Sequence, residues 1–173
     1  TNDDELAAYI RTISNHGLIN RNQAQIWGYN SRLDELQAAF ALCKLPSITH
    51  INNRYISIAS TYSERLCGLL SKPSIRSDFR DIYHNYVVNV DPSIRDALIC
   101  NCAAEGVSLS IHYPIPLHLQ ECYTKMYNTN NASLPKAENL SRSMVSLPIY
   151  PGLTPKELNY VVNVFNDNLH KLS

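Results

Sequence analysis

The stretch YHNYVVNVDPSIRDALICNCAAEGVSLSI, residues 83–111, decides the predicted fold. Its first eight residues are rich in β-branched and aromatic side chains, a composition typical of a strand. Asp91 and Pro92 then supply a helix cap and a first helical residue, and Gly106 ends the helix. Residues 107–111 alternate apolar and polar side chains, which predicts a second strand. This order of strand, helix and strand indicates a small sheet with helices packed on it.

The sequence after this stretch continues the alternation of helices and strands. Residues 112–120 form a loop stiffened by prolines, and two helices are predicted over about 119–126 and 135–144. The stretch VSLPIYP, residues 145–151, predicts a third short strand and a turn. TPKE, residues 154–157, is a capping box with proline at the first helical position. We expect the helix that begins there to run to the end of the chain.

The N-terminal part of the chain shows helical periodicity instead. Helices are predicted over residues 1–14, 33–45 and 48–70, and residues 18–32 read as a loop rich in Asn and Gln. The period changes from helical to strand-like after this part. A boundary is therefore predicted near residues 69–77.

Composition excludes several classes of protein. The 173 residues are 45% hydrophobic and 17% charged, which is globular and is enough for a small domain plus part of another. The formal net charge is zero, so nothing favours a nucleic acid or a membrane as partner. No apolar run approaches the roughly 20 residues of a membrane span, and we expect a cytoplasmic location. Because the chain starts at Thr1 and enters a helix at once, we expect it to be a piece of a longer protein.

The five cysteines do not indicate a disulfide framework or a metal site. Their number is odd and their spacing is scattered. Cys100 and Cys102 look like a metal-binding pair, but no second pair and no nearby histidine completes a tetrahedral site. His112 and His118 also lack a third ligand close by. We therefore predict no metal, and buried free thiols in a cytosolic protein.

Two polar stretches are candidates for ligand binding. NSR, which contains Asn30 and Arg32, stands directly before a predicted helix, where free N–H groups and a guanidinium suit a phosphate. The alternative is that its Asn or Ser merely caps that helix. Tyr113 and His118 belong to HYPIPLHLQ, residues 112–120, whose prolines fix the side-chain directions. Such a segment suits a binding loop or an ordinary connector, and the residues alone leave both alternatives open.

Seven motifs follow one another along the chain: NHG, GYNSRLDELQAAF, the spaced residues KL, I, RY, A and Y, then HNYVV, HYPIPLHLQ, LPKAENLS and SLPIYPGLT. Together they resemble the C-terminal half of the DegT/DnrJ/EryC1/StrS family of pyridoxal-phosphate-dependent sugar aminotransferases. The resemblance covers essentially the whole chain and implies an α/β fold, the C-terminal part of a fold-type I transferase. Residues 1–72 would be the helical end of the large cofactor-binding domain with a connecting long helix. Residues 73–173 would be the small C-terminal α+β domain.

The resemblance also implies a chemistry and its residues. It implies a homodimeric enzyme that uses pyridoxal 5′-phosphate to move an amino group from an amino acid, glutamate in the usual case, to a nucleotide-linked keto-sugar, here a dTDP-keto-deoxyhexose. Asn30 matches the family residue that binds the cofactor phosphate of the other subunit. Arg32 matches the arginine beside it, a phosphate or substrate contact. Tyr113 and His118 match residues of a loop close to the sugar nucleotide.

The family's Schiff-base lysine is not matched in this sequence. The resemblance places it upstream of Thr1, and none of the six lysines stands at its position. We therefore expect no catalytic residue in the chain and no activity of the chain alone. The alternative is a non-catalytic or lysine-lacking family member: a dehydratase, a regulator or an inert truncated remnant.

Overall fold

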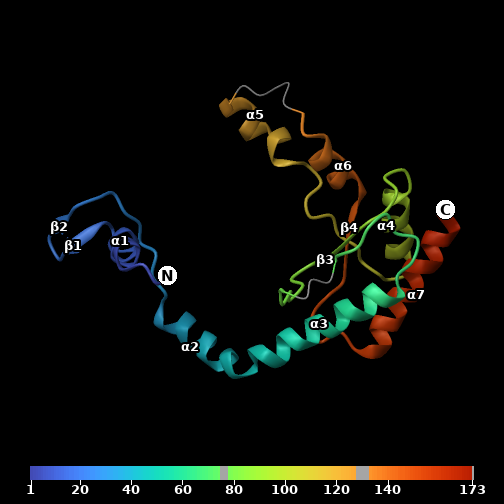
Figure 1. The fold of residues 1–173 in the computed structure, drawn as a ribbon, viewed down its shortest axis with the longest axis horizontal. Coiled ribbons are helices and arrows are strands. Elements are labelled where there is room, and N and C mark those ends of the chain that lie inside the picture. The colour runs from blue at the N-terminus through green and yellow to red at the C-terminus, as the bar shows by residue number, and fades with distance from the viewer. Residues whose placement is uncertain (75–77, 128–132, 173) are drawn as a thin grey trace. The chain divides into compact units, whose positions relative to one another are not determined.

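The structure, a computed structural model, describes residues 1–74, 78–127 and 133–172. The chain forms two compact units, residues 1–48 and residues 49–173. Figure 1 shows the elements of each unit along the chain. The assignment of residues 1–72 to a larger domain concerns the whole protein and stays a prediction.

The first unit combines helices with a small hairpin. Helix α1, Asp4–Ser14, is followed by strands β1, Leu18–Asn20, and β2, Gln23–Ala24, which pair antiparallel. Helix α2, Glu35–Lys44, continues into the short 3-10 helix η1, Leu45–Ser47. The hairpin corrects the sequence prediction, which assigned a loop to this stretch. Strands of three and two residues are too short to show an alternating pattern in the sequence.

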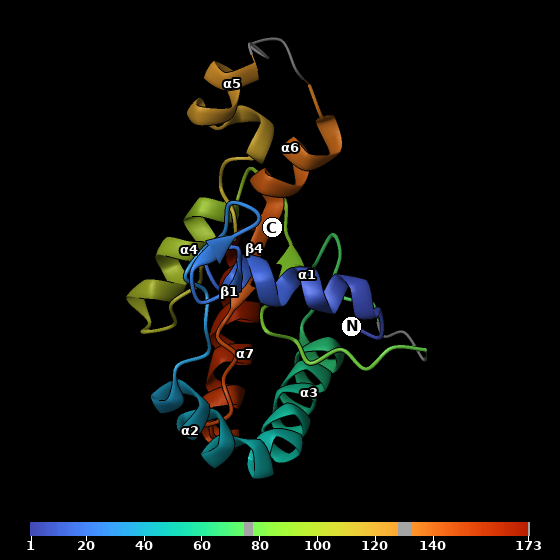
Figure 2. The ribbon, with the colours of Figure 1, turned by 90° about the vertical axis from the view of Figure 1, so that its left-hand side faces the viewer.

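Two glycines let the chain return from the hairpin against the end of α1. Gly17 has a φ of +73°, a conformation that residues with a side chain rarely adopt. A Cβ atom on Gly28 would lie 2.2 Å from the nitrogen of Gly17 and 2.6 Å from the carbonyl oxygen of Ile13. The backbone at Gly28, which follows the hairpin, therefore lies directly against the backbone at the end of α1. Figure 2 shows α1 and the hairpin in blue.

The apolar stripe of α2 is present but uncovered. Leu36 and Phe40 of α2, together with Leu33 before its start and Leu45 after its end, are between 62% and 71% exposed, and no residue of α1 or α2 is buried. Trp27 is fully exposed. Contiguous apolar side chains of this size are typical of a surface that another protein segment covers.

The second unit is built on a short antiparallel sheet. Strand β3, Tyr86–Asn89, pairs with β4, Met144–Leu147, and single bridges at Ser71 and Ser110 extend the sheet on its two sides. The predicted strands near 83–90 and 145–151 are thus confirmed in shorter form. The strand predicted over 107–111 is wrong as such, because that segment contributes only the bridge at Ser110.

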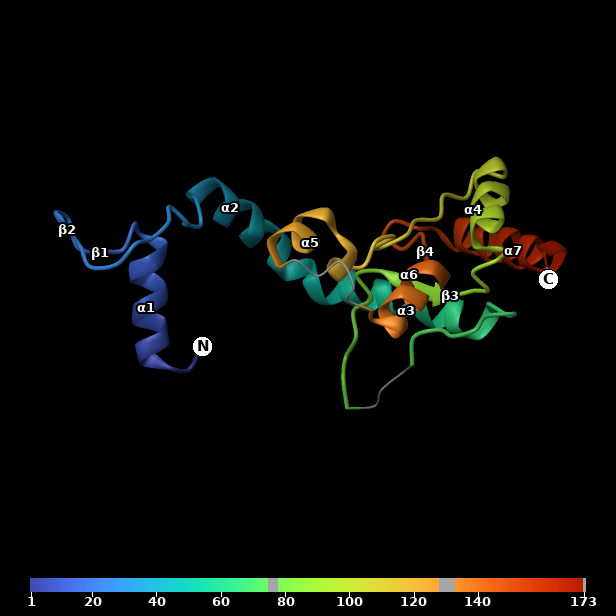
Figure 3. The same ribbon diagram turned by 90° about the horizontal axis from the view of Figure 1, so that it is seen from above.

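The described helices of the second unit are α3, Ile48–Arg65; α4, Arg95–Ala104; α5, Glu121–Tyr127; α6, Pro135–Ser143; and α7, Pro155–Leu172. A short 3-10 helix, η2, Leu117–Leu119, precedes α5. Helix α4 packs against α7, as Figure 3 shows. Helix α6 passes directly into β4 with no residue between them.

Two predicted helix starts have different outcomes. The TPKE capping box is confirmed: Glu157 accepts from the backbone N–H of Thr154 at 2.8 Å, and Thr154 Oγ1 accepts from the N–H of Glu157 at 3.2 Å. The Asp91 cap is wrong for α4, which begins four residues later. The Asp91 carboxylate instead accepts from the backbone and hydroxyl of Ser93, and these bonds lower its pKa.

The core of the second unit joins the sheet to three helices. Its fully buried side chains include Ile58 and Tyr62 of α3, Val88 of β3, Leu98 of α4 and Phe165 of α7. Truncating a buried side chain of this kind costs about 2–5 kcal/mol. This packing holds in place the strands and helices from which the loops after β3 and before α6 extend.

Four of the five cysteines differ from the prediction of buried thiols. Cys102 is buried in the core, and burial raises its pKa to about 11. Cys43, Cys67, Cys100 and Cys122 are exposed. All five are free thiols.

Candidate functional site

The turn that carries Asn30 is fixed by backbone hydrogen bonds to the end of α1. The N–H of Tyr29 donates to the carbonyl of Ile13 at 2.7 Å, and the N–H of Ser31 donates to the carbonyl of Ser14 at 2.9 Å. Asn30 itself forms a single antiparallel bridge with Asn15. These bonds hold the backbone of the turn in place, while the side chain of Asn30 is exposed.

Neither Asn30 nor Ser31 caps α2, so the capping alternative is wrong for this helix. The cap residue is Asp34, whose side chain makes no capping hydrogen bond. A carboxylate at this position would repel an anion from the helix N-terminus. The candidate phosphate contact thus lies on the preceding turn rather than on the helix end.

Arg32 is directed by Asn15. Its Nη2 donates to the Oδ1 of Asn15, which lies just past the end of α1. A guanidinium carries five N–H donors on three nitrogens, and this contact occupies only the nitrogen Nη2. Asn30 and Arg32 together offer an exposed amide and a fixed positive charge, which is the donor set that a phosphate needs. These residues therefore fit the phosphate of pyridoxal phosphate.

The loop of residues 112–120 borders a hollow of about 670 Å³ in the second unit. Tyr113, Leu117 and His118 line it from the loop, Tyr123 from α5, and Met144 from β4. Tyr113 is 74% exposed and free to meet a ligand. A concave, mainly apolar site with a few polar groups is typical of a small-molecule pocket.

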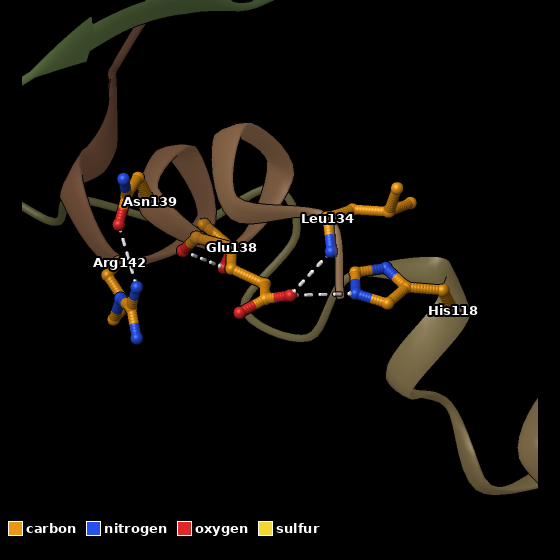
Figure 4. A network of polar contacts seen from close by, with 6 residues as sticks. His118, Leu134, Glu138, Asn139 and Arg142 are labelled. Atoms are coloured by element: carbon orange, nitrogen blue, oxygen red, sulfur yellow. Dashed lines mark hydrogen bonds and ion pairs between the residues drawn. The ribbon is translucent and has the colours of Figure 1, made fainter. Parts of the chain in front are cut away.

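His118 is buried and bonded, in contrast to Tyr113. It is 7% exposed, and its Nε2 lies 3.1 Å from Oε1 of Glu138 at the start of α6. The same Glu138 oxygen accepts the backbone N–H of Leu134 at 2.8 Å. Figure 4 shows this network, with Arg142 bonded to Asn139 on the next turn of the helix. His118 thus forms part of the wall of the hollow and connects the loop to α6.

The electrostatics of this network favour an ionised glutamate. The pKa of Glu138 lies below its ordinary value because the Leu134 N–H and then His118 bond its charged form. Glu138 is therefore a carboxylate at neutral pH, and its side chain is 24% exposed.

Two polar residues of this region were not among those predicted to bind a ligand: His112, which was considered only as a metal ligand, and Glu138. His112 lines the hollow, and its Nδ1 lies 3.0 Å from the hydroxyl of Ser146 in β4. The only sequence signal for Glu138 is the segment LPKAE, which resembles the helix start TPKE in having proline at the first helical position and a glutamate in the first turn.

A second hollow, of about 790 Å³, lies along the N-terminal half of α7. Tyr150, Leu153 and Tyr160 line it, and its lining holds none of the four residues that the sequence predicted for binding. Those four fall into two sets: Asn30 and Arg32 lie in the first unit, and Tyr113 and His118 lie in the second.

Within residues 1–74, 78–127 and 133–172, no three His, Cys, Asp or Glu side chains are placed to hold a metal ion. The described helices also include none with the length and apolarity to cross a membrane.

Relatives with known roles match this chain over nearly its whole length. A dTDP-3-amino-3,6-dideoxy-α-D-galactopyranose transaminase of Aneurinibacillus thermoaerophilus is 35% identical over 96% of the chain and 45% of the relative. Other matching relatives are also transaminases of nucleotide-linked sugars. A pleiotropic regulatory protein of Geobacillus stearothermophilus is 33% identical over 94% of the chain and 44% of the relative. The chain thus spans a little under half the length of the relatives it matches.

The fold is likewise similar to solved structures. The crystal structure of S. venezuelae DesV, in complex with a ketimine intermediate, has a TM-score of 0.90 and 31% identity. The match covers the whole of this chain and 46% of DesV. The sequence profile of the DegT/DnrJ/EryC1/StrS aminotransferase family, whose members depend on pyridoxal phosphate, matches residues 1–166. The chain belongs to the DegT/DnrJ/EryC1/StrS aminotransferase family.

Proposed function

We propose that the protein containing this chain is a pyridoxal-phosphate-dependent aminotransferase that acts on a nucleotide-linked keto-sugar in amino-sugar biosynthesis. The observation that carries the proposal is the family match over residues 1–166, which includes the fixed turn bearing Asn30. The substrate is a dTDP-keto-deoxyhexose, as the 35% identical transaminase suggests. The amino donor is glutamate, and the enzyme works in the cytoplasm as a homodimer.

The cofactor, when bound, carries the amino group and takes up electrons during the transfer. In this proposal residues 1–72 belong to the large domain, and Asn30 and Arg32 hold the cofactor phosphate of the other subunit. An amide N–H and a guanidinium both donate to phosphate oxygens, and hydrogen bonds to a charged group are about twice as strong as neutral ones. The backbone bonds around Asn30 keep the turn that carries it in place before the phosphate arrives.

Residues 73–173 form the small domain and supply one wall of the sugar-nucleotide site. Tyr113 presents an exposed ring and hydroxyl at the hollow, where a nucleobase or sugar can pack on the ring. His118 shapes this wall from inside the loop. The apolar side chains in the hollow exclude water from the bound substrate. The lysine that moves the proton lies upstream of Thr1 in this proposal, so the chain alone is inactive.

The test uses the full-length protein with pyridoxal phosphate, glutamate and dTDP-keto-deoxyhexoses that carry the keto group at different ring positions. Formation of 2-oxoglutarate that depends on the sugar nucleotide, together with a dTDP-amino-sugar by mass spectrometry, is the expected result. UDP-linked keto-sugars serve as the comparison for the nucleotide. Absence of transfer with every keto-sugar would contradict the proposal.

A non-catalytic role is the second candidate, because one relative at 33% identity is a regulatory protein. A protein of this kind would bind its ligand without consuming it. The two candidates separate in one experiment: binding of a nucleotide sugar without any transfer of the amino group favours the regulator.

A further inference from the structure

Glu138 joins two segments through one oxygen. Its Oε1 accepts the backbone N–H of Leu134 at 2.8 Å and lies 3.1 Å from Nε2 of His118, twenty residues earlier in the chain. A ring nitrogen that is nearly shielded from water needs a partner, and Glu138 is the partner of His118. Figure 4 shows the carboxylate between the start of α6 and the histidine ring. The contact therefore closes the C-terminal end of the loop onto α6.

The other end of the loop is fixed in a similar way. His112 bonds to Ser146, which is 5% exposed in β4. Because α6 and β4 are continuous, both ends of the loop are attached to one segment of the chain. Between these attachments lie Tyr113 and Leu117, which are 74% and 72% exposed and border the hollow. The two contacts thus set how the loop presents its ligand-facing side chains.

The histidine contact of Glu138 goes beyond what helix capping needs. Glu157 also accepts the backbone N–H at the start of its helix at 2.8 Å, and its other bond is to the hydroxyl of Thr154 in the same cap. Glu138 makes the equivalent backbone bond and adds a side chain from another element. Helix α6 has a further anchor, because Arg95 Nη1 donates to the carbonyl of Ser141 at 2.7 Å. Loss of the Glu138 carboxylate should therefore free the loop while leaving α6 in place.

We propose that Glu138 is a positioning residue for the nucleotide-sugar substrate, which holds the loop of residues 112–120 in its binding conformation through His118. This inference rests on the proposed function and adds a residue to it. Glu138 acts on the loop and makes no contact with the substrate in this assignment. Its effect should appear in substrate affinity and in the mobility of the loop, and cofactor binding should be unchanged.

The experiment uses the full-length protein loaded with pyridoxal phosphate, and dTDP and UDP as probes. Calorimetry gives the Kd of each nucleotide for the wild type and for E138A, E138Q, H118A and the double variant H118A/E138A. Hydrogen–deuterium exchange of peptides covering residues 113–120 reports the loop directly. E157A is the matched control, because it removes a helix-start carboxylate that has no histidine partner.

The expected result is a Kd about tenfold higher in E138A, in line with loss of a hydrogen bond to a charged group. E138Q keeps an oxygen acceptor and should recover part of this loss. If Glu138 acts through His118, the double variant should bind no more weakly than H118A, whereas independent effects would multiply to about a hundredfold. Exchange over 113–120 should rise in E138A and H118A and stay at the wild-type level in E157A.

Unchanged loop exchange in E138A, multiplying effects in the double variant, or an equal loss of nucleotide affinity in E157A would each overturn the inference. Failure of the proposed function has a different signature: the wild type itself then binds neither dTDP nor UDP, or transfers no amino group. If the wild type binds the nucleotides but transfers no amino group, nucleotide affinity and loop exchange still decide the role of Glu138.

Discussion

The amide nitrogen of Tyr29 donates to the carbonyl oxygen of Ile13 at 2.7 Å, which ties the turn before Asn30 to the last residues of α1. The backbone on either side of Asn30 is thus fixed by bonds that need no particular side chain. The backbone of the turn and the side chain that it presents can therefore be tested by different substitutions.

The first prediction concerns the contact. Asn30→Ala in the full-length protein should weaken pyridoxal phosphate binding by about tenfold or more, because a hydrogen bond to a charged group is worth about 1.5–3 kcal/mol. Equilibrium dialysis of the cofactor measures this. Asn20→Ala, in the neighbouring hairpin, is the control and should bind as the wild type does. Equal cofactor affinity in both variants would refute the role of Asn30.

The second prediction concerns the scaffold. Gly28→Ala should disrupt the turn, because the new Cβ would lie 2.2 Å from the nitrogen of Gly17 and cannot be accommodated without a backbone shift. We expect faster hydrogen exchange over residues 25–31 and weaker cofactor binding. Gly152→Ala is the matched control, since its Cβ would lie 3.6 Å from Tyr150, an ordinary contact. Wild-type exchange in the Gly28 variant would show that the close approach is absent in solution.

The third prediction concerns the substrate side. His118→Ala should raise the KM for the keto-sugar nucleotide by about tenfold through loss of the bond to Glu138, while cofactor binding survives. Steady-state kinetics with saturating glutamate, and the absorbance of the bound cofactor, measure the two effects. Normal sugar kinetics together with a lost cofactor would mean that the loop serves the other ligand.

The fourth prediction concerns pH. The pKa of Glu157 is lowered, first by the backbone N–H of Thr154 and then by its hydroxyl. A lowered pKa means that the charged form stabilises the fold above the ordinary value of 4.5, and that this stabilisation is lost as pH falls through the lower, folded-state value. Glu157→Gln should therefore have a lower Tm than the wild type at pH 7, and the difference should shrink as the pH falls below 4.5. A difference that stays constant as the pH falls through the acid range would show that the charge of Glu157 is not its cause.

The fifth prediction concerns the chain by itself. Residues 1–173 alone should show no aminotransferase activity, because the lysine-dependent proton transfer, worth about 10²–10⁴-fold, is assigned upstream of Thr1. The exposed apolar stripe of α2 should also make the isolated chain associate. Incubation with pyridoxal phosphate, borohydride reduction and mass spectrometry would locate any labelled lysine. Stoichiometric labelling of one of the six lysines, together with turnover, would contradict this prediction.

Local sequence signals predicted much of the fold. The TPKE box marked the start of α7 because capping depends on residues three apart, and β3 was visible because its side chains are β-branched and aromatic. The hairpin β1–β2 was missed, since five residues show no period. The strand predicted at 107–111 was reduced to one bridge, because pairing depends on a neighbouring strand that the local pattern does not contain.

The site was less predictable than the fold. The motifs pointed to Asn30 and His118, but no local pattern shows that a glutamate twenty residues from His118 is its partner. The same holds for the hydroxyl of Ser146 beside His112. Side-chain pairs of this kind are formed by tertiary packing, so a single sequence gives the candidates and not their contacts.

The attachment of both ends of the 112–120 loop to the α6–β4 segment has a thermodynamic consequence. A loop that is ordered only by its ligand loses conformational entropy on binding, at about 1–2 kcal/mol for each residue fixed. Here the folding of the second unit has already restricted the loop, so that loss does not fall on the binding step. Ligand affinity at this site should therefore be governed by the contacts themselves, with a small entropic penalty for each nucleotide bound.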